Sequence, residues 1–195
     1  MYVRDAKNRD EVWLLDHIEA MGLDDAAFRS RDYVIAVDEE TNERAGFGRI
    51  RVHKTDDGDL CELTGVGVLE EWRGQGVGAH VVERLVHEAG DQGFETVYAL
   101  TDGAEYLAQF GFEPVETDAL PEKIRDRLAT KRDEVGEEVV GTALDAAEFS
   151  MPPRFREAFK NAAPAAGDGE SEVEETAEDF GIDPDTATYK YDTGR

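Results

Sequence analysis

Two spacings of apolar residues alternate along the chain. Runs rich in β-branched residues with a period of two predict strands, whereas apolar residues three and four apart predict helices. Strands are expected at residues 1–7, in two arms of a hairpin over 32–54, and at 59–69, 95–101, 112–117 and 137–146. Helices are expected at residues 8–21, 24–29, 77–92, 104–112, 121–132 and 151–160. This order predicts an α/β (α+β) fold, with a mixed, mostly antiparallel sheet flanked by helices.

The centre of the chain runs from a strand through a glycine-rich turn into a helix. The strand at 59–69 precedes the sequence WRGQGVGA, residues 72–79, and an apolar stripe marks the helix that follows until Gly93. A further strand comes next, at 95–101. Because a strand–helix–strand order favours parallel pairing, these two strands should lie side by side.

Length and composition predict one domain over residues 1–163, with its core in 1–150. Residues 164–179 contain seven acidic residues and no basic one, so we expect 164–195 to be an acidic, disordered tail. Cys61 is the only cysteine, which leaves no intramolecular disulfide and no cysteine-based zinc site. No metal site is expected. The absence of a leader or a long apolar run predicts a soluble, cytoplasmic protein without a membrane segment.

The net charge of −25 limits the possible partners. A surface this acidic repels polyphosphates at long range, so nucleic-acid binding is not expected. Adaptation to high salt, as in a halophile, explains the excess of carboxylates better than an acidic face made for a cationic substrate. The global charge therefore says little about the ligand, and local chemistry must identify it.

The glycine-rich turn is suited to a phosphate. A strand that enters a turn and then a helix presents free backbone N–H groups and the positive end of the helix dipole to an anion. Gly74, Gly76 and Ala79 satisfy the dinucleotide pattern, but the acidic residue that should hold a ribose about 20 positions on is misplaced, since Glu95 starts the next strand and Asp102 lies too far along. A Walker A motif is excluded because no Lys-Ser/Thr pair follows the glycines. A tight turn without any ligand remains the alternative.

The stretch VLEEWRGQGVGA, residues 68–79, resembles the acetyl-CoA loop of the GNAT superfamily of N-acetyltransferases. Arg73, Gly76 and Gly78 occupy the fixed positions of the pattern [Q/R]-x-x-G-x-[G/A], and the order of elements is similar over residues 1–150. The resemblance implies a GNAT fold, acetyl-CoA as co-substrate, and backbone amides that hold its pyrophosphate. The cofactor-binding residues that it implies are Val66, Gly67, Val68, Arg73, Gly74, Gln75, Gly76, Val77, Gly78 and Ala79.

The resemblance also implies catalytic roles. Gly67 or Val68 would supply the N–H that stabilises the thioester oxygen. Glu62 is the candidate catalytic base, because strand alternation places it with Thr64 and Val66 on one face and burial should raise its pKa; a solvated residue at the strand end is the alternative. The usual acid tyrosine is replaced by Leu107, so Tyr106 is expected to pack into the core.

Residues 97–125 are similar to acetyltransferases that act on the α-amino group of free amino acids, namely N-acetylglutamate synthases and arsinothricin-resistance enzymes. This implies a free amino acid or small amine as acceptor. A protein N-terminal or lysine acetyltransferase is the first alternative, and a non-catalytic acyl-CoA-binding sensor is the second. A homodimer is possible. Arg49 and Arg51 are candidates for binding a substrate carboxylate, although a solvated sheet face is the simpler interpretation for both.

Overall fold

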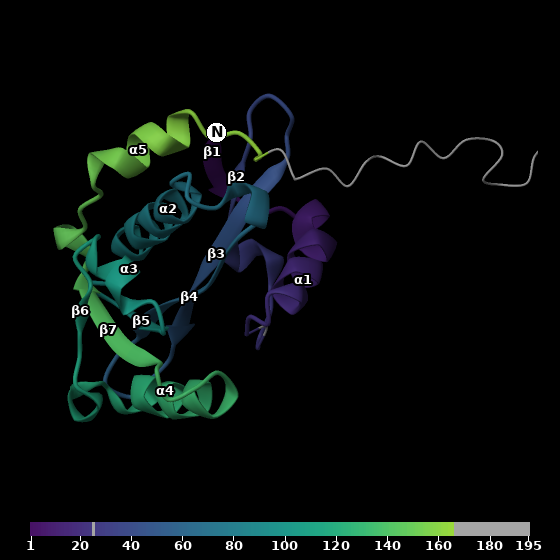
Figure 1. Cartoon of the computed structure of the whole chain (residues 1–195). Helices are drawn as coiled ribbons and strands as arrows, with labels where there is room; N and C mark the ends of the chain where they lie inside the picture. Colours follow the sequence, from purple (N-terminus) through teal and green to yellow (C-terminus); the bar gives the residue numbers. More distant parts are fainter. Residues whose placement is uncertain (25, 166–195) are drawn as a thin grey trace, which may run out of the picture. The chain divides into compact units, whose positions relative to one another are not determined.

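A seven-stranded sheet forms the centre of the structure, a computed structural model that describes residues 1–24 and 26–165 (Figure 1). The strand order is β1-β2-β3-β4-β5-β7-β6, and every neighbouring pair is antiparallel except β4 and β5, which are parallel. The strands are β1 (Tyr2–Asp5), β2 (Tyr33–Val37), β3 (Arg44–His53), β4 (Leu60–Val68), β5 (Thr96–Thr101), β6 (Glu113–Pro114) and β7 (Val140–Asp145). The mixed, mostly antiparallel sheet is thus confirmed.

Within residues 1–24 and 26–165, five α-helices cover the two faces of the sheet. They are α1 (Glu11–Ala20), α2 (Val77–Asp91), α3 (Ala104–Ala108), α4 (Glu122–Glu134) and α5 (Pro153–Lys160). One face carries α2, with α3 and α5 beside it, and these elements share one apolar core with β2 to β5 and β7. The other face carries α1 against β2 and β3, and α4 against β5 and the start of β7.

Alternation along β2 shows why both faces must be covered. Tyr33, Ile35 and Val37 pack with α1, whereas Val34 and Ala36 pack with α2. Every residue of this strand is therefore buried, as expected for a strand with helices on both sides. The face that carries α1 and α4 has one apolar cluster under each helix. The middle of the sheet on this face carries polar side chains.

The expected second helix at residues 24–29 does not form. Asp24 accepts a hydrogen bond from the Ala26 N–H (2.8 Å), the local turn that competes with a helix start. The carbonyl oxygens of Asp24 and Ala26 accept hydrogen bonds from Arg49 Nη2, and Ala27 has a φ of +53°. Contacts with a distant strand thus take the place of helical hydrogen bonds.

Residues Met1–Pro164 form one compact unit of the structure. A disordered tail is expected at 164–195. Residues 166–195 of this segment lie outside the described part of the chain, so this stays a prediction. Among the helices of the described residues, none is long and apolar enough to span a lipid bilayer.

Candidate functional site

The site begins where β4 separates from its parallel neighbour. Pairing between β4 and β5 extends only from Cys61–Val97 to Leu63–Ala99, although β4 continues to Val68. At Gly65, which has a φ of +60°, an extra residue bulges out of β4, and the register with β3 shifts there. The backbone groups that β4 carries beyond Leu63 are thereby released from β5.

The bulge also changes which side chains share a face. Cys61 and Leu63 pack toward α2, so Glu62 and Thr64 point to the face of α1 and α4. After the bulge, Val66 and Val68 pack toward α2. The prediction that Val66 shares the face of Glu62 and Thr64 is therefore wrong, because one extra residue reverses the alternation.

A cavity of about 890 Å³ passes through this opening in the sheet. On the α2 side its walls include Trp72, the glycine turn, Tyr106 and Phe155. On the other side they include residues 21–24 at the end of α1, together with Lys131 and Val135 of the α4 end. One continuous space thus connects the start of α2 with the polar face between α1 and α4, large enough for an extended ligand.

The glycine turn forms one end of this cavity. Gly76 is the N-cap residue of α2 in a left-handed conformation (φ +76°), and no side chain caps the helix. Among the described residues, no side chain therefore caps the first N–H groups of this 15-residue helix. Arg73, Gly74 and Gly78 line the cavity beside them. This end suits the phosphates of coenzyme A, as the sequence motif implies.

Seven of the ten residues expected to bind the coenzyme line the cavity, and three do not. Those in the wall are Val66, Val68, Arg73, Gly74, Gly76, Val77 and Gly78. Gly67 faces Met21 and Phe47, Ala79 is fully buried in the core, and Gln75 is bonded to the Ala163 N–H. None of these three residues lines the cavity, so only their backbone groups remain candidates for binding the coenzyme.

Glu62 is fully buried and does not line the cavity. His53 Nε2 lies 2.7 Å from Glu62 Oε2, and Arg127 donates to the same carboxylate at 3.3 and 3.5 Å. Burial alone raises the pKa of Glu62, but the hydrogen bond from His53 and the charge of Arg127 outweigh it and lower the pKa. The expected rise in pKa is therefore wrong, because a buried cation and a histidine accompany the carboxylate.

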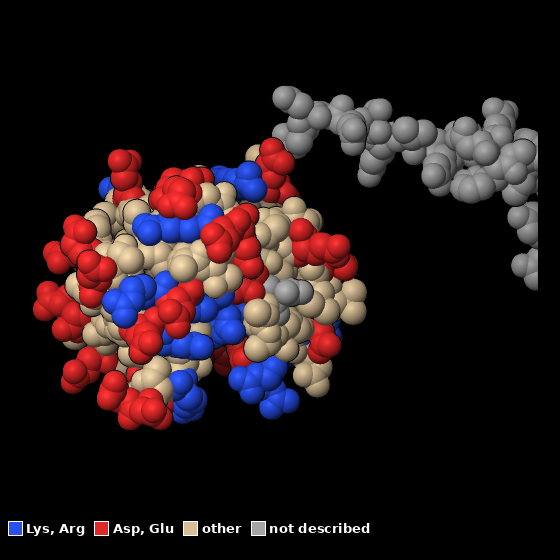
Figure 2. All heavy atoms as spheres, turned by 90° about the horizontal axis from the view of Figure 1, so that it is seen from below, with Lys and Arg blue, Asp and Glu red and all other residues tan. Residues whose placement is uncertain are grey.

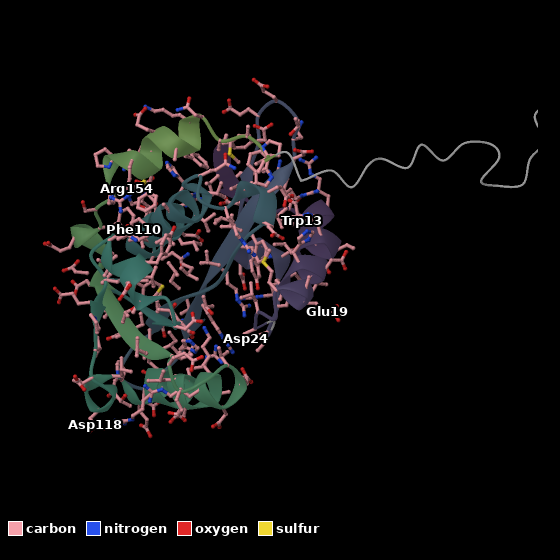
Figure 3. All side chains as sticks on the ribbon, in the orientation of Figure 1. Trp13, Glu19, Asp24, Phe110, Asp118 and Arg154 are labelled. Atoms are coloured by element: carbon pink, nitrogen blue, oxygen red, sulfur yellow. The ribbon has the colours of Figure 1, made fainter. Side chains whose placement is uncertain are left out.

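Arg127 joins this carboxylate to the loop after α1. Its Nη2 donates to Asp24 Oδ2 at 2.7 Å, and Arg51 lies 3.4 Å from the same oxygen. Arg49 is 2% exposed and donates to the carbonyl oxygens of that loop, so the solvated sheet face expected for Arg49 is wrong. Figure 3 shows Asp24 between α1 and α4. The three arginines hold the loop after α1, which forms part of the cavity wall.

Two polar side chains line the cavity on the side of α1 and α4. Thr64 is 4% exposed, and its hydroxyl has no hydrogen-bond partner among the described residues. Lys131 donates to the Leu100 carbonyl (2.9 Å), and burial lowers its pKa. Both line the cavity, so each can bind a substrate atom. Sequence reasoning missed Lys131, Arg127 and Asp24 because nothing in the sequence indicates that α4 packs beside β4 with Arg127 in reach of Glu62 and Asp24.

Tyr106 lies in the cavity wall and not in the core. It is 39% exposed, whereas Leu107 is 6% exposed and packs into the core. A Cβ atom on Gly78 would be 3.0 Å from the Tyr106 hydroxyl, so the phenol lies directly over the first turn of α2. Burial among apolar groups raises the pKa of Tyr106 to about 12. The expected core position is wrong because the helix turns Leu107, not Tyr106, toward the sheet.

Comparison with known families agrees with this geometry. The model of the acetyltransferase (GNAT) family matches residues 3–112, which is more than half of the chain. The chain belongs to this family. An uncharacterised N-acetyltransferase of Chlorobaculum tepidum is 31% identical over 65 residues, which are 33% of this chain and 42% of that relative. The match thus spans less than half of the curated relative.

Solved structures with low sequence identity share the fold. A Mycobacterium tuberculosis protein solved with CoA and NLQ has a TM-score of 0.61 at 20% identity, over 74% of this chain and 99% of its own. N-acetylglutamate synthase from Neisseria gonorrhoeae, with CoA and N-acetyl-glutamate, has a TM-score of 0.59 at 18% identity, over 73% of this chain and 34% of its own. An Arabidopsis thaliana protein bound to a CoA–peptide bisubstrate analogue has a TM-score of 0.52 at 13% identity, over 72% of this chain and 95% of its own.

Within the part of the chain that the structure describes, no group of three or more His, Cys, Asp or Glu side chains is arranged to hold a metal ion.

Proposed function

We propose that this chain is an acetyl-CoA-dependent N-acetyltransferase whose acceptor is a free amino acid or a similar small amine. The cavity through the opening between β4 and β5 carries the proposal, because it joins the uncapped start of α2 to a polar pocket on the opposite face. The coenzyme supplies an acetyl group as a thioester. With its phosphates at the glycine turn, its acyl end lies along the released edge of β4.

Groups of β4 then serve the transfer. A backbone N–H at Gly67 or Val68 stabilises the charge that develops on the thioester oxygen, as the family resemblance implies. The free hydroxyl of Thr64 is placed to orient the acceptor amine or a water molecule beside it. The amine must lose a proton before it attacks. Glu62 remains the predicted base by resemblance, but its low pKa favours a positioning role, in which it holds His53 and Arg127.

The acceptor end contains charges of both signs. Lys131 contributes an ammonium group, and Asp24 and Asp102 contribute carboxylates to the same wall. Figure 2 shows the molecule from the side of α4, where basic and acidic groups lie next to one another. A free amino acid presents both an ammonium and a carboxylate, so it complements such a wall better than a simple amine does. We propose that Lys131 binds the acceptor carboxylate.

An acceptor panel tests the proposal. Release of free CoA from acetyl-CoA should be stimulated by free amino acids and much less by the matching amines that lack the carboxylate. Preference for peptides would favour the protein N-terminal alternative. Binding of CoA without turnover on any acceptor would favour the sensor. The assays require molar salt, so that an unfolded acidic protein does not imitate inactivity.

Lys131→Met is the matching variant. It should raise KM for an amino acid about tenfold, because a charge-assisted hydrogen bond is lost, and leave KM for the amine without a carboxylate unchanged. Lys123→Met removes the same charge from an exposed position of α4 and is the control. If KM rises equally for both acceptors, Lys131 does not recognise the carboxylate.

A further inference from the structure

Helix α5 lies directly against the glycine turn. A Cβ atom on Gly76 would be 2.3 Å from the Phe155 carbonyl oxygen, so the backbones of the two elements touch. The Phe159 ring stacks on His80 of α2, with ring centroids 3.8 Å apart. The Ala163 N–H donates to Gln75 Oε1 at 2.9 Å. Helix α5 and the residues that follow it thus form the outer wall of the turn.

Phe155 forms part of the cavity wall itself. Its ring lines the cavity together with Gly76 and Tyr106. The guanidinium carbon of Arg154 lies 4.7 Å from the centre of the same ring. Figure 3 shows Arg154 on α5 near Phe110. The Phe155 ring therefore lies between the Arg154 charge and the end of the cavity at the glycine turn.

The charges around the turn determine what α5 contributes. A chain with a net charge of −25 repels an anionic coenzyme, so binding requires local cations. Within α5, Arg156 and Lys160 are paired with Glu83 and Glu157. Arg154 donates to the neutral amide oxygen of Gln109 and has no carboxylate partner in the described part of the chain.

We propose that α5 is part of the coenzyme site and that Arg154 binds a phosphate group of the coenzyme. The inference rests on the proposed function, since it assumes that coenzyme A occupies this cavity. Arg154 exchanges a neutral amide acceptor for a charged phosphate oxygen, which forms a stronger, charge-assisted hydrogen bond. Helix α5 follows the residues 3–112 that the family model matches, so this contact belongs to a C-terminal element outside the matched core.

Calorimetric titration of the full chain with coenzyme A tests the proposal. Arg154→Ala should raise the Kd about tenfold or more, and Arg154→Lys, which keeps the charge, should recover part of the loss. Arg9→Ala is the control, because Arg9 is exposed and has no carboxylate partner among the described residues. Unchanged melting temperatures of the apo proteins would show that the variants are folded.

Each outcome has one interpretation. If the unchanged chain does not bind coenzyme A, the proposed function fails and the inference fails with it. If it binds and Arg154→Ala binds equally well, only the inference is overturned. Tighter binding by Arg154→Ala also overturns it, because α5 would then compete with the coenzyme. If Arg154→Ala weakens the binding of coenzyme A but not of dephospho-coenzyme A, Arg154 contacts the 3′-phosphate. If it weakens the binding of both ligands equally, Arg154 contacts the pyrophosphate.

Discussion

At the residue scale, the surroundings of Glu62 determine which chemistry its carboxylate can perform. His53 and Arg127 keep it ionised in a position with no exposed surface. A general base works best with a pKa near the operating pH, and a carboxylate with a lowered pKa accepts a proton poorly. The same ion pairs are well suited to hold β3, β4 and α4 together under the acceptor end.

Glu62→Gln separates these roles. Because the folded-state pKa of Glu62 is lowered, its ion pairs stabilise the fold above the unfolded pKa of about 4.3 and are lost as the pH falls through the folded value. We expect Glu62→Gln to cost about 3 kcal/mol of unfolding free energy at pH 7 and less at acid pH. Denaturant titration at both pH values measures this, with exposed Glu70→Gln as the control.

The pH profile of kcat completes the Glu62 experiment. A positioning role predicts a loss of activity of similar size at pH 7 and pH 9. Recovery of kcat at high pH, where the amine loses its proton unaided, would restore Glu62 as the base.

Tyr106 lies beside the glycine turn, but its pKa makes it a poor acid. With a pKa of about 12, the phenol transfers a proton uphill to a thiolate whose conjugate acid has a pKa of about 8.5. The hydroxyl is better suited to donate a hydrogen bond to bound coenzyme. Tyr106→Phe should therefore raise the Kd for coenzyme A a few-fold and lower kcat less than about threefold. A loss of about 10² in kcat with an unchanged Kd would identify Tyr106 as a general acid.

At the scale of elements, Gly76 and Gly78 of the glycine turn contact different parts of the structure. Gly76 touches the backbone of α5 and has a positive φ, whereas Gly78 faces the cavity and the Tyr106 hydroxyl. Gly76→Val should displace α5 and lower the melting temperature, because a backbone atom cannot move away cheaply. Gly78→Val should leave the fold intact, because the flexible Tyr106 side chain can yield.

Coenzyme-induced stabilisation distinguishes the two variants. At about 100 times its Kd, coenzyme A should add roughly 2.7 kcal/mol to the unfolding free energy of the unchanged chain. Gly78→Val should abolish most of this gain, since its side chain enters the cavity. A full gain in Gly78→Val would show that the coenzyme does not approach the first turn of α2.

The periodic elements were predictable from the sequence because local patterns specify them. The hairpin, the strand before the glycine turn and helix α2 all lie within a few residues of their expected bounds. The bulge at Gly65 was not predictable, since Gly65 and Gly67 are equivalent in the sequence TGVGV and only the pairing with β3 selects one of them. A single inserted residue then reversed the expected direction of Val66.

The acceptor end of the site depends on contacts between distant segments. Arg127 meets Glu62 and Asp24 only because α4 packs against β5 and β7 through Ile124 and Leu128. A helical pattern predicts that α4 has an apolar side but not which part of the sheet it covers. The glycine turn was predictable because its proposed ligand groups are backbone groups of one continuous segment, whereas side chains from distant segments assemble the proposed acceptor pocket.

At the scale of the whole molecule, the net charge of −25 opposes folding. Ion pairs relieve this locally, as where Asp10, which is fully buried, binds both Arg4 and Arg44. These contacts keep the pKa of Asp10 well below its usual range. The chain has 46 Asp and Glu against 21 Lys and Arg, so its cations are too few to pair one to one with its carboxylates. The remaining repulsion acts over the surface and is open to screening by salt.

Salt should therefore stabilise the protein. Raising monovalent salt from 0.1 M to above 1 M shortens the Debye length from about 10 Å to about 3 Å, which removes most of the repulsion between separate surface carboxylates. The buried ion pairs of Asp10 and Glu62 are screened much less, so the stabilising contacts survive. We expect the melting temperature to rise by roughly 10 °C, equivalent to about 3 kcal/mol for a domain of this size.

Calorimetric melting in KCl and in NaCl measures this rise, and equal effects of the two salts would indicate screening and not the binding of one cation. Sucrose, an excluded but uncharged solute, controls for general stabilisation of the compact state. A melting temperature that stays constant or falls between 0.1 and 2 M salt would contradict the argument, because self-repulsion would then contribute little to the free energy of unfolding. The excess of carboxylates would in that case need an explanation other than adaptation to high salt.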